Sequence, residues 1–216
     1  MILREFTNDV DAFAEVYWQN EYRLPDQIGP DDVILDIGAH IGCFALACVK
    51  RGAKRVVCYE PEASNFALLA RNTAPYLQYV EIHNAAVWRS DRVEQTRIVY
   101  GGKGRTTDCQ IFSDYGDIVH SVQFDTILKN LGKVRLCKLD CEGSEYPILY
   151  TSKELARVRE FAGESHEHLK YVGCPQECSI NGIVNFLNNN GFEAEGVRNP
   201  RGGGAVYWFF AKRKAT

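Results

Sequence analysis

The chain has 216 residues, of which 45% are hydrophobic and 25% charged, and a formal net charge of −3. It can fill the core of one domain, and it lacks the basic excess of nucleic-acid-binding proteins. No apolar stretch approaches the ~20 residues that cross a membrane, and the first residues lack the apolar core of a signal peptide. We expect a single domain over residues 1–216, a cytoplasmic location and eight cysteines that stay reduced.

The first thirty residues contain one predicted helix. Apolar residues recur at helical spacing from Asp9 to about Tyr22. Residues 1–6 fit either a short strand or a disordered start. We interpret residues 1–30 as a helical lid or side wall of a ligand site within the same domain. Simple packing on the edge of the sheet is the alternative.

The segment from Val33 to Gly42 predicts a strand, a glycine turn and the start of a helix. Its first three residues form an apolar run, which is typical of a parallel strand covered on both faces. Asp36 closes the strand, and Gly38 and Gly42 bracket the turn. The helix that follows has apolar residues on one face: Ile41, Phe44, Ala45 and Cys48. Such a unit holds nucleotide-like ligands.

The spacing of this turn indicates which ligand it binds. It is D-x-G-x-x-x-G, which differs from the dinucleotide pattern G-x-G-x-x-G, and no lysine follows to make a P-loop. The carboxylate of Asp36 repels pyrophosphate and accepts from an ammonium group, which favours S-adenosylmethionine. Glu60 ends the predicted strand Arg55–Glu60, where an acidic residue pairs with two ribose hydroxyls. The alternative is that these carboxylates only cap the next helix.

A helix and a strand follow the second strand. The helix begins near Pro61 and ends at Pro75, and Tyr79–His83 alternates like a strand. The residues expected to face inward from the helix are Phe66, Leu69 and Ala70. The small side chains of Ala85 and Ala86 leave room for a flat ring, so they are a candidate wall for adenine. Tight packing against a neighbouring strand is the alternative.

The pattern loosens from Val93 to Ser121. Arg97–Tyr100 is strand-like, and glycines at 101, 102 and 104 follow it. We expect a mobile hairpin that covers the acceptor pocket. Phe124–Leu128 is the predicted helix before the next central strand.

A second chemical centre ends the predicted strand Arg135–Asp140. Strand periodicity places Lys138 and Asp140 on one face. The sequence Asp140-Cys-Glu-Gly-Ser-Glu145 crowds carboxylates at this strand end, which raises the pKa of at least one of them. A fifth predicted strand begins at Arg159 and ends in Glu164-Ser-His166. Since ligands of open α/β sheets sit beyond the carboxyl ends of the strands, we expect Asp36, Glu60, Asp140 and Glu164 to line one edge, with His166 just outside it.

The same groups are the candidate general bases. A hydroxyl acceptor needs a proton acceptor within hydrogen-bond reach. We hypothesise that His166 or Glu164 takes the proton, with Lys138 and Asp140 as reserves. A Mg²⁺ ion held by Asp140, Glu164 and His166 is an alternative that suits hard oxygen ligands, but we expect no metal.

A second metal-like group lies after the fifth strand. It contains His166, His168, Cys174 and Cys178, but its spacing is not C-x-x-C, and we do not expect zinc. The chain then closes with a helix and a strand pair. Their predicted bounds are Ile180–Asn190, Phe192–Val197 and Ala205–Ala211.

Five segments together resemble the FkbM-type S-adenosylmethionine-dependent methyltransferases. They are Val33–Gly42, Tyr59–Pro61, Asn84–Val87, Phe124–Leu128 and Lys138–Glu145. The last, Lys-x-Asp-x-Glu-Gly-x-Glu, is the most specific. The family has Asn where this chain has His40. The resemblance implies an α/β Rossmann-like class I fold: a seven-stranded, mostly parallel sheet with helices on both faces and an antiparallel C-terminal strand. It also implies O-methylation of a sugar or polyketide-like product.

The resemblance also implies roles for single residues. Asp36, Gly38 and Gly42, with Ala39 and His40 between them, lie under the methionine end of the cofactor. Glu60 and Pro61 meet the ribose, and Asn84, Ala85 and Ala86 lie near the adenine. Asp140 lies beside the transferred methyl group.

Other functions stay open from the sequence. We expect a small-molecule or glycan acceptor, with no nucleic acid and no membrane span. The alternatives are a nucleic-acid or protein methyltransferase, and an interaction module that binds S-adenosylmethionine without catalysis. The absence of an N-P-P-Y or D-P-P-Y element argues against methylation of base amines. The chain also fits one domain of a larger glycan-assembling protein.

Overall fold

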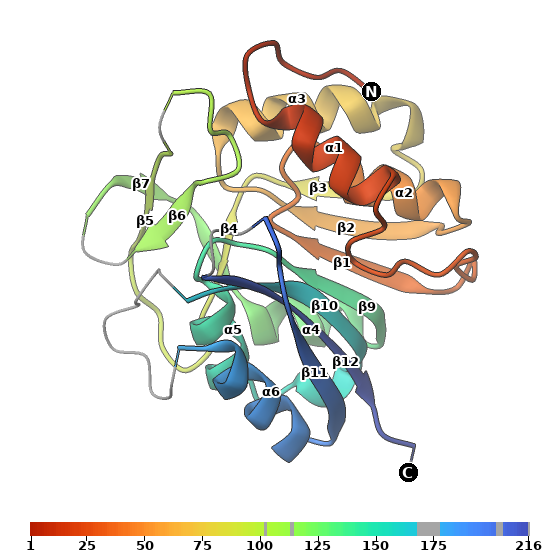
Figure 1. Cartoon of the computed structure of the whole chain (residues 1–216), viewed down its shortest axis with the longest axis vertical. Helices are drawn as coiled ribbons and strands as arrows, with labels where there is room; N and C mark the ends of the chain where they lie inside the picture. Colours follow the sequence, from red (N-terminus) through yellow and green to blue (C-terminus); the bar gives the residue numbers. More distant parts are fainter. Residues whose placement is uncertain (102, 113–114, 168–177, 202–204, 216) are drawn as a thin grey trace.

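A sheet of seven strands runs through the middle of the molecule and separates two groups of helices (Figure 1). The computed structural model describes residues 1–101, 103–112, 115–167, 178–201 and 205–215, and of Phe112 only the backbone. The strand order is β11-β12-β10-β9-β1-β2-β3. The strands are β1 Val33–Ile37, β2 Arg55–Tyr59, β3 Val80–His83, β9 Val134–Leu139, β10 Val158–His166, β11 Phe192–Arg198 and β12 Val206–Arg213.

Strand direction agrees with the prediction. The strands from β10 to β3 are parallel, whereas β12 is antiparallel to both β10 and β11. The predicted seven-stranded, mostly parallel sheet is therefore confirmed. Its parallel strands all end at one edge, which is where ligands bind in open α/β sheets.

Helices cover both faces of the sheet, as predicted. One face carries α1 Asp9–Tyr17, α2 Cys43–Lys50 and α3 Ala63–Thr73, and the other carries α4 Phe124–Leu131, α5 Glu145–Thr151 and α6 Ile180–Asn189 (Figure 1). Short 3₁₀ turns span Ala74–Tyr76 and Leu155–Arg157. Across the described ranges, none of the helices is both long and apolar enough to cross a membrane.

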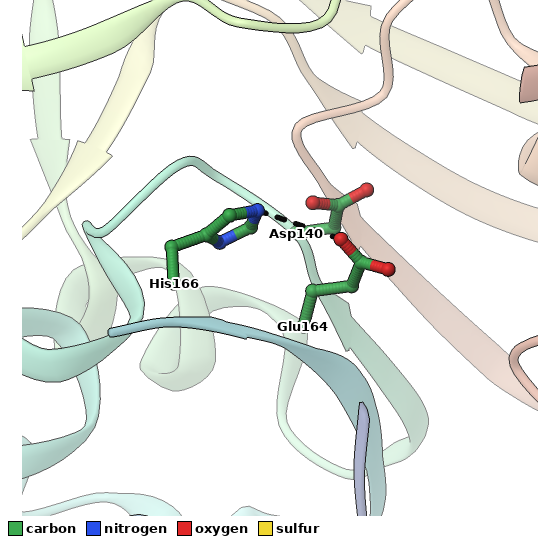
Figure 2. Close-up of side chains that lie close together, drawn as sticks. All are labelled: Asp140, Glu164 and His166. Atoms are coloured by element: carbon green, nitrogen blue, oxygen red, sulfur yellow. Dashed lines mark ion pairs between the residues drawn. The ribbon is translucent and has the colours of Figure 1, made fainter. Parts of the chain in front are cut away.

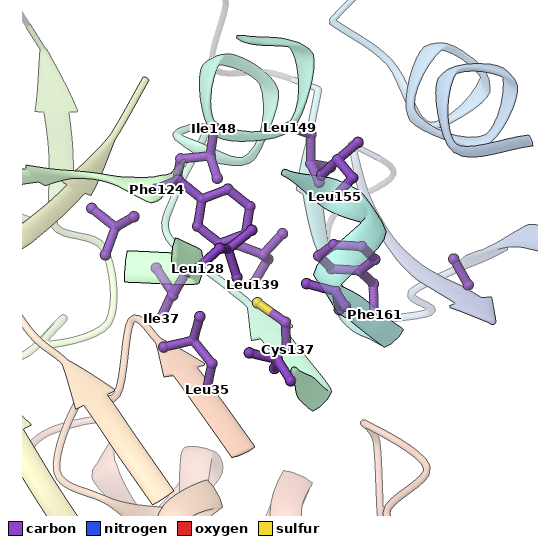
Figure 3. Packing of buried hydrophobic residues seen from close by; sticks show 14 of the residues in the cluster. Leu35, Ile37, Phe124, Leu128, Cys137, Leu139, Ile148, Leu149, Leu155 and Phe161 are labelled. Carbon is purple, nitrogen blue, oxygen red and sulfur yellow. The ribbon is translucent and has the colours of Figure 1, made fainter. Parts of the chain in front are cut away.

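The apolar run of β1 explains this double cover. Side chains of successive strand residues point to opposite faces. Ile34 belongs to the apolar core under α1 to α3, and Leu35 and Ile37 belong to the core under α4 to α6. Figure 3 shows Leu35 and Ile37 packed near Phe124 of α4 in that second core.

The first helix is shorter than predicted. It ends at Tyr17 instead of Tyr22, because the chain turns at Asn20, whose φ is +47°. The Asn20 side chain stabilises the turn by bonding to both the N–H and the C=O of Leu24. Residues 1–6 contain no strand, so the first of the two structures considered for them is wrong.

Two smaller sheets lie where a hairpin was predicted. β5 Thr96–Val99 pairs antiparallel with β6 Gln110–Phe112 and β7 Asp117–Val119. β4 Ala86–Trp88 pairs in parallel with β8 Ser121–Gln123. The pair of β5 and β6 agrees with the predicted hairpin, and β7 adds a third strand to it. On α3, Leu69 is buried and Phe66 packs against the same core, as predicted, whereas the second fully buried residue is Leu68 and Ala70 is half-buried.

Candidate active site

Two cavities open beside the carboxyl ends of β1, β2 and β9. They share a wall made of Gly38, His40, Thr107, Asp140 and Glu142. The two cavities are therefore adjacent.

The first cavity has one acidic corner and an apolar slot. Glu60 is 4% exposed and lies in the corner, where its carboxylate accepts the N–H of His40 at 2.8 Å and that of Glu62 at 2.9 Å. Burial raises the pKa of Glu60. Ala85 and Ala86 line the slot. A carboxylate for hydroxyl groups beside a narrow apolar slot fits the ribose and adenine of an adenosine group.

The strand ends of β1 and β9 almost touch at the shared wall. Gly38 has a φ of +78°, and a Cβ placed there would lie 1.8 Å from the backbone oxygen of Asp140. Only glycine allows both this backbone conformation and this approach. The neighbouring His40, at φ +50°, takes the left-handed conformation that Asn tolerates better than most residues.

Beneath this wall lies a buried ion pair. Lys138 Nζ is 3.2 Å from Asp36 Oδ1 and donates to the carbonyl of Gly38 at 2.6 Å. Burial lowers the pKa of Lys138, but Asp36 and Asp140 outweigh it and raise the pKa above its usual range. Lys138 is therefore a fixed cation that lines the second cavity and supports the turn.

Carboxylates surround a buried histidine in the second cavity. His166 is 3% exposed, and its Nδ1 lies 2.7 Å from Glu145 Oε1. Its Nε2 lies 3.4 Å from Glu164 Oε2 and 3.6 Å from Glu142 Oε2 (Figure 2 draws the pair with Glu164). Burial lowers the pKa of His166, but Glu142 and Glu145 raise it well above its ordinary value. Burial raises the pKa of Glu142 to about 8.

Residues 36–194 match the profile of the methyltransferase FkbM domain. The chain belongs to the FkbM methyltransferase family. The match begins inside β1 and covers the turn, the acidic corner and the second cavity's strand ends. S-adenosylmethionine is therefore the methyl donor, and the residues that line the first cavity suit its adenosine group.

Three individual proteins resemble all or part of this FkbM chain. A segment of 89 residues is 37% identical to the AMB antimetabolite synthetase AmbE of Pseudomonas aeruginosa PAO1, and it covers 41% of this chain and 4% of that protein. A methyltransferase FkbM from Methylobacillus flagellatus KT aligns with a TM-score of 0.57 at 15% identity, over 92% of this chain and 47% of that one. A SAM-dependent methyltransferase from Aquifex aeolicus aligns with a TM-score of 0.52 at 13% identity, over 94% of this chain and 93% of that one. These two structures share the fold of this FkbM chain.

Most of the predicted cofactor residues of this FkbM chain line the two cavities. They are Gly38, Ala39, His40, Glu60, Pro61, Ala85, Ala86 and Asp140. Asp36, Gly42 and Asn84 do not line either cavity. Asp36 lies behind the wall and contacts Lys138, so the ammonium group that it accepts from belongs to the protein. Asn84 donates to the carbonyls of Glu60 and Pro61 and so holds the acidic corner in place.

The predicted catalytic residues come together as well. Lys138, Asp140, Glu164 and His166 all line the second cavity, and α1 adds a wall through Ala12, Glu15 and Val16. His166 is the last residue of β10 and is buried, which contradicts its placement just outside the sheet edge. Two of the four possible zinc ligands, His168 and Cys174, lie outside the described residues.

Sequence reasoning missed several residues of the site. Glu142 and Glu145 stand in the quoted FkbM motif, so the motif itself was the signal that they line or support the site. Tyr22 donates to Asp140 Oδ2 at 2.7 Å across 118 residues, and Thr107 enters both cavities from the segment between β5 and β6. Neither segment has a periodic pattern that could have indicated this.

Proposed function

We propose that this chain transfers the methyl group of S-adenosylmethionine to a hydroxyl of a sugar, a glycan or a related small natural product. The observation that carries the proposal is the pair of carboxylates, Glu142 and Glu164, that face His166 Nε2 beside the shared wall. A proton acceptor at that place lies next to the cofactor cavity. When bound, S-adenosylmethionine supplies an electrophilic methyl group on a sulfonium sulfur.

The residues of the second cavity align and deprotonate the acceptor in this account. The acceptor oxygen points toward the shared wall at Gly38 and Asp140, in line with the methyl group. A carboxylate takes the hydroxyl proton as the new C–O bond forms and the C–S bond breaks, which leaves an ether, a neutral thioether and a carboxylic acid. The walls from α1 and Tyr22 exclude water.

Geometry favours a carboxylate over His166 as this base. Both ring nitrogens of His166 face carboxylate oxygens, so both serve best as donors. A ring that donates from both nitrogens has no lone pair free to take the hydroxyl proton of the methyl acceptor. Lys138 is equally unsuited, because Asp36 and the Gly38 carbonyl hold its ammonium group. We therefore assign the role of general base to Glu142 or Glu164 and not to His166.

The polar lining supports a hydroxyl-rich acceptor. The lining of the second cavity also includes Glu15, Glu21, Arg105, Asp108, Asn199 and Arg201. Several hydrogen-bond acceptors and donors at short spacing match the alternating hydroxyls of a sugar better than an apolar substrate. The 37% identity of one segment to a far longer synthetase also supports a setting within, or beside, a larger assembly.

The test is transfer of a radiolabelled methyl group to a panel of glycosides and natural-product alcohols. We expect labelled ethers that resist alkali, and a fall in kcat of about 10²–10⁴-fold in Glu142→Gln or Glu164→Gln. Glu160→Gln is the matched control, because Glu160 lies on the same strand as Glu164 but at its start. Near-full turnover in both active-site variants would place the base elsewhere. Label found only in protein or RNA would refute the acceptor class.

A further inference from the structure

We propose that Asp140, Glu164 and His166 form a binding site for a hard divalent cation of the Mg²⁺ or Mn²⁺ class. One ligand atom from each of the three side chains lies within 4.8 Å of the other two. Figure 2 shows the three side chains converging from the ends of β9 and β10. The sequence pattern alone predicts no metal here, whereas the contacts of each side chain favour one.

Each of the three side chains is held through one atom by a fixed partner. Tyr22 donates to Asp140 Oδ2 at 2.7 Å. Asn199 and Trp208 each donate to Glu164 Oε1 at 3.0 Å, while Oε2 of that carboxylate faces His166. Partners of this kind orient metal ligands and are as much a part of metal sites as the ligands.

Glu145 is the most specific of these partners. It is fully buried, and its Oε1 lies 2.7 Å from His166 Nδ1. Its Oε2 is buried and has no hydrogen-bond partner among the residues that the structure describes, so the carboxylate is costly to keep there. A carboxylate on Nδ1 directs Nε2 at the cation in carboxylate–histidine–metal sites. That role accounts for the buried carboxylate of Glu145.

The charges around the ring also call for a cation. Glu142 and Glu164 face Nε2, Glu145 faces Nδ1, and Asp140 completes the cluster. Glu142 is held in the left-handed conformation at φ +52°, which is unusual for this residue type. A divalent cation bound by Nε2 would place two positive charges among these four carboxylates.

The ligand set selects the class of metal. Two carboxylates and one imidazole are mainly hard oxygen donors, which suit Mg²⁺ and Mn²⁺ better than thiolate-seeking metals. The role of the cation rests on the proposed function: it would polarise the acceptor hydroxyl beside the methyl group. With Glu164 as a ligand, Glu142 is then the base.

The experiment measures Mn²⁺ binding to the full chain with S-adenosylhomocysteine present, by calorimetry and by electron paramagnetic resonance. We expect one Mn²⁺ per chain and a nitrogen hyperfine coupling from a single imidazole. Glu164→Gln and His166→Asn should each weaken binding at least tenfold, and Glu145→Gln by about 10–100-fold. Glu160→Gln should bind like the wild type. Thermal midpoints check that each variant is folded.

Two outcomes overturn the site. One is wild-type chain that binds S-adenosylhomocysteine but no Mn²⁺ at millimolar concentration. The other is bound Mn²⁺ without a nitrogen coupling, which needs no variant to be detected. Failure of the proposed function is distinguishable, because Mn²⁺ would then bind with the expected coupling while no alcohol in the panel was methylated.

Discussion

The buried pair of Lys138 and Asp36 shows how single residues support the turn at Gly38. The Asp36 carboxylate is inaccessible to solvent and lies next to the Lys138 ammonium, which in turn holds the carbonyl of Gly38. Removing one charge leaves the other buried without its main partner. That loss is more costly than replacing both by apolar groups.

Asp36→Leu should lower the free energy of unfolding by about 3–5 kcal/mol, because it strands the ammonium group of Lys138. The double variant with Lys138→Met should lose less than the single variant. Urea denaturation of the three proteins measures both effects. An unchanged unfolding free energy in Asp36→Leu would show that the ion pair does not stabilise the fold.

Residues at strand ends were the ones that the sequence could place. Glu60 and Asp140 follow short buried strands, and the shared edge of parallel strands brings them together. Asp36, also predicted to contact the ligand, lies one residue inside β1, where its side chain points to the helix-covered face beside Lys138. No such rule predicts the position of Tyr22, because it lies in an irregular segment.

At the scale of elements, the approach of β1 to β9 fixes the wall between the cavities. Asp140 donates its N–H to the Ile37 carbonyl at 3.2 Å, directly after the last paired residues of the two strands. Gly38 then turns the chain against the Asp140 backbone. A side chain at Gly38 would push these strand ends apart.

Gly38→Ala should therefore destabilise the protein more than an ordinary glycine substitution. A left-handed residue costs about 1–2 kcal/mol when it gains a Cβ, and the overlap with Asp140 should add about 1–3 kcal/mol. Gly191→Ala is the matched control, because its φ is +85° but a Cβ there meets only Arg213 at 4.0 Å. Equal losses in urea denaturation would contradict the close approach.

Across the whole molecule, the N-terminal segment is tied to distant parts of the chain. Asp9 is buried at the start of α1 and accepts from Arg4 and from Thr106. Burial raises the pKa of Asp9, but the contacts with His40 and Arg4 outweigh it and hold the pKa well below its usual range. One carboxylate thus joins residues 1–9, the turn after β1 and the segment between β5 and β6.

This depressed pKa predicts how stability changes with pH. The contribution of Asp9 is complete above its unfolded pKa of about 3.9 and is lost as pH falls toward its folded value. The stability gap between wild type and Asp9→Asn should shrink by about 1.4 kcal/mol per pH unit below about pH 4. Asp11→Asn, at an exposed position in the same helical turn, is the control. A gap that stays constant from pH 7 to pH 3 would refute the prediction.

The sheet was predictable because buried parallel strands appear as short apolar runs, such as Ile34 and Leu35 of β1. The packing around the acceptor site was not. Residues 103–109 are mostly polar and carry no period, so tertiary contacts such as those of Thr106 with Asn8 and Asp9 determine their course. The acceptor side of the site is built largely from such segments.

Calorimetric titration with S-adenosylmethionine and S-adenosylhomocysteine is the most direct test of the cofactor site. We expect one-to-one binding to the wild type and a loss of about ten- to a hundredfold in Glu60→Gln, since a charged acceptor for two hydroxyls becomes neutral. Glu81→Gln, an exposed change on β3, should bind normally. Absence of binding to the wild type, or equal affinity in Glu60→Gln, would contradict the placement of the cofactor in the first cavity.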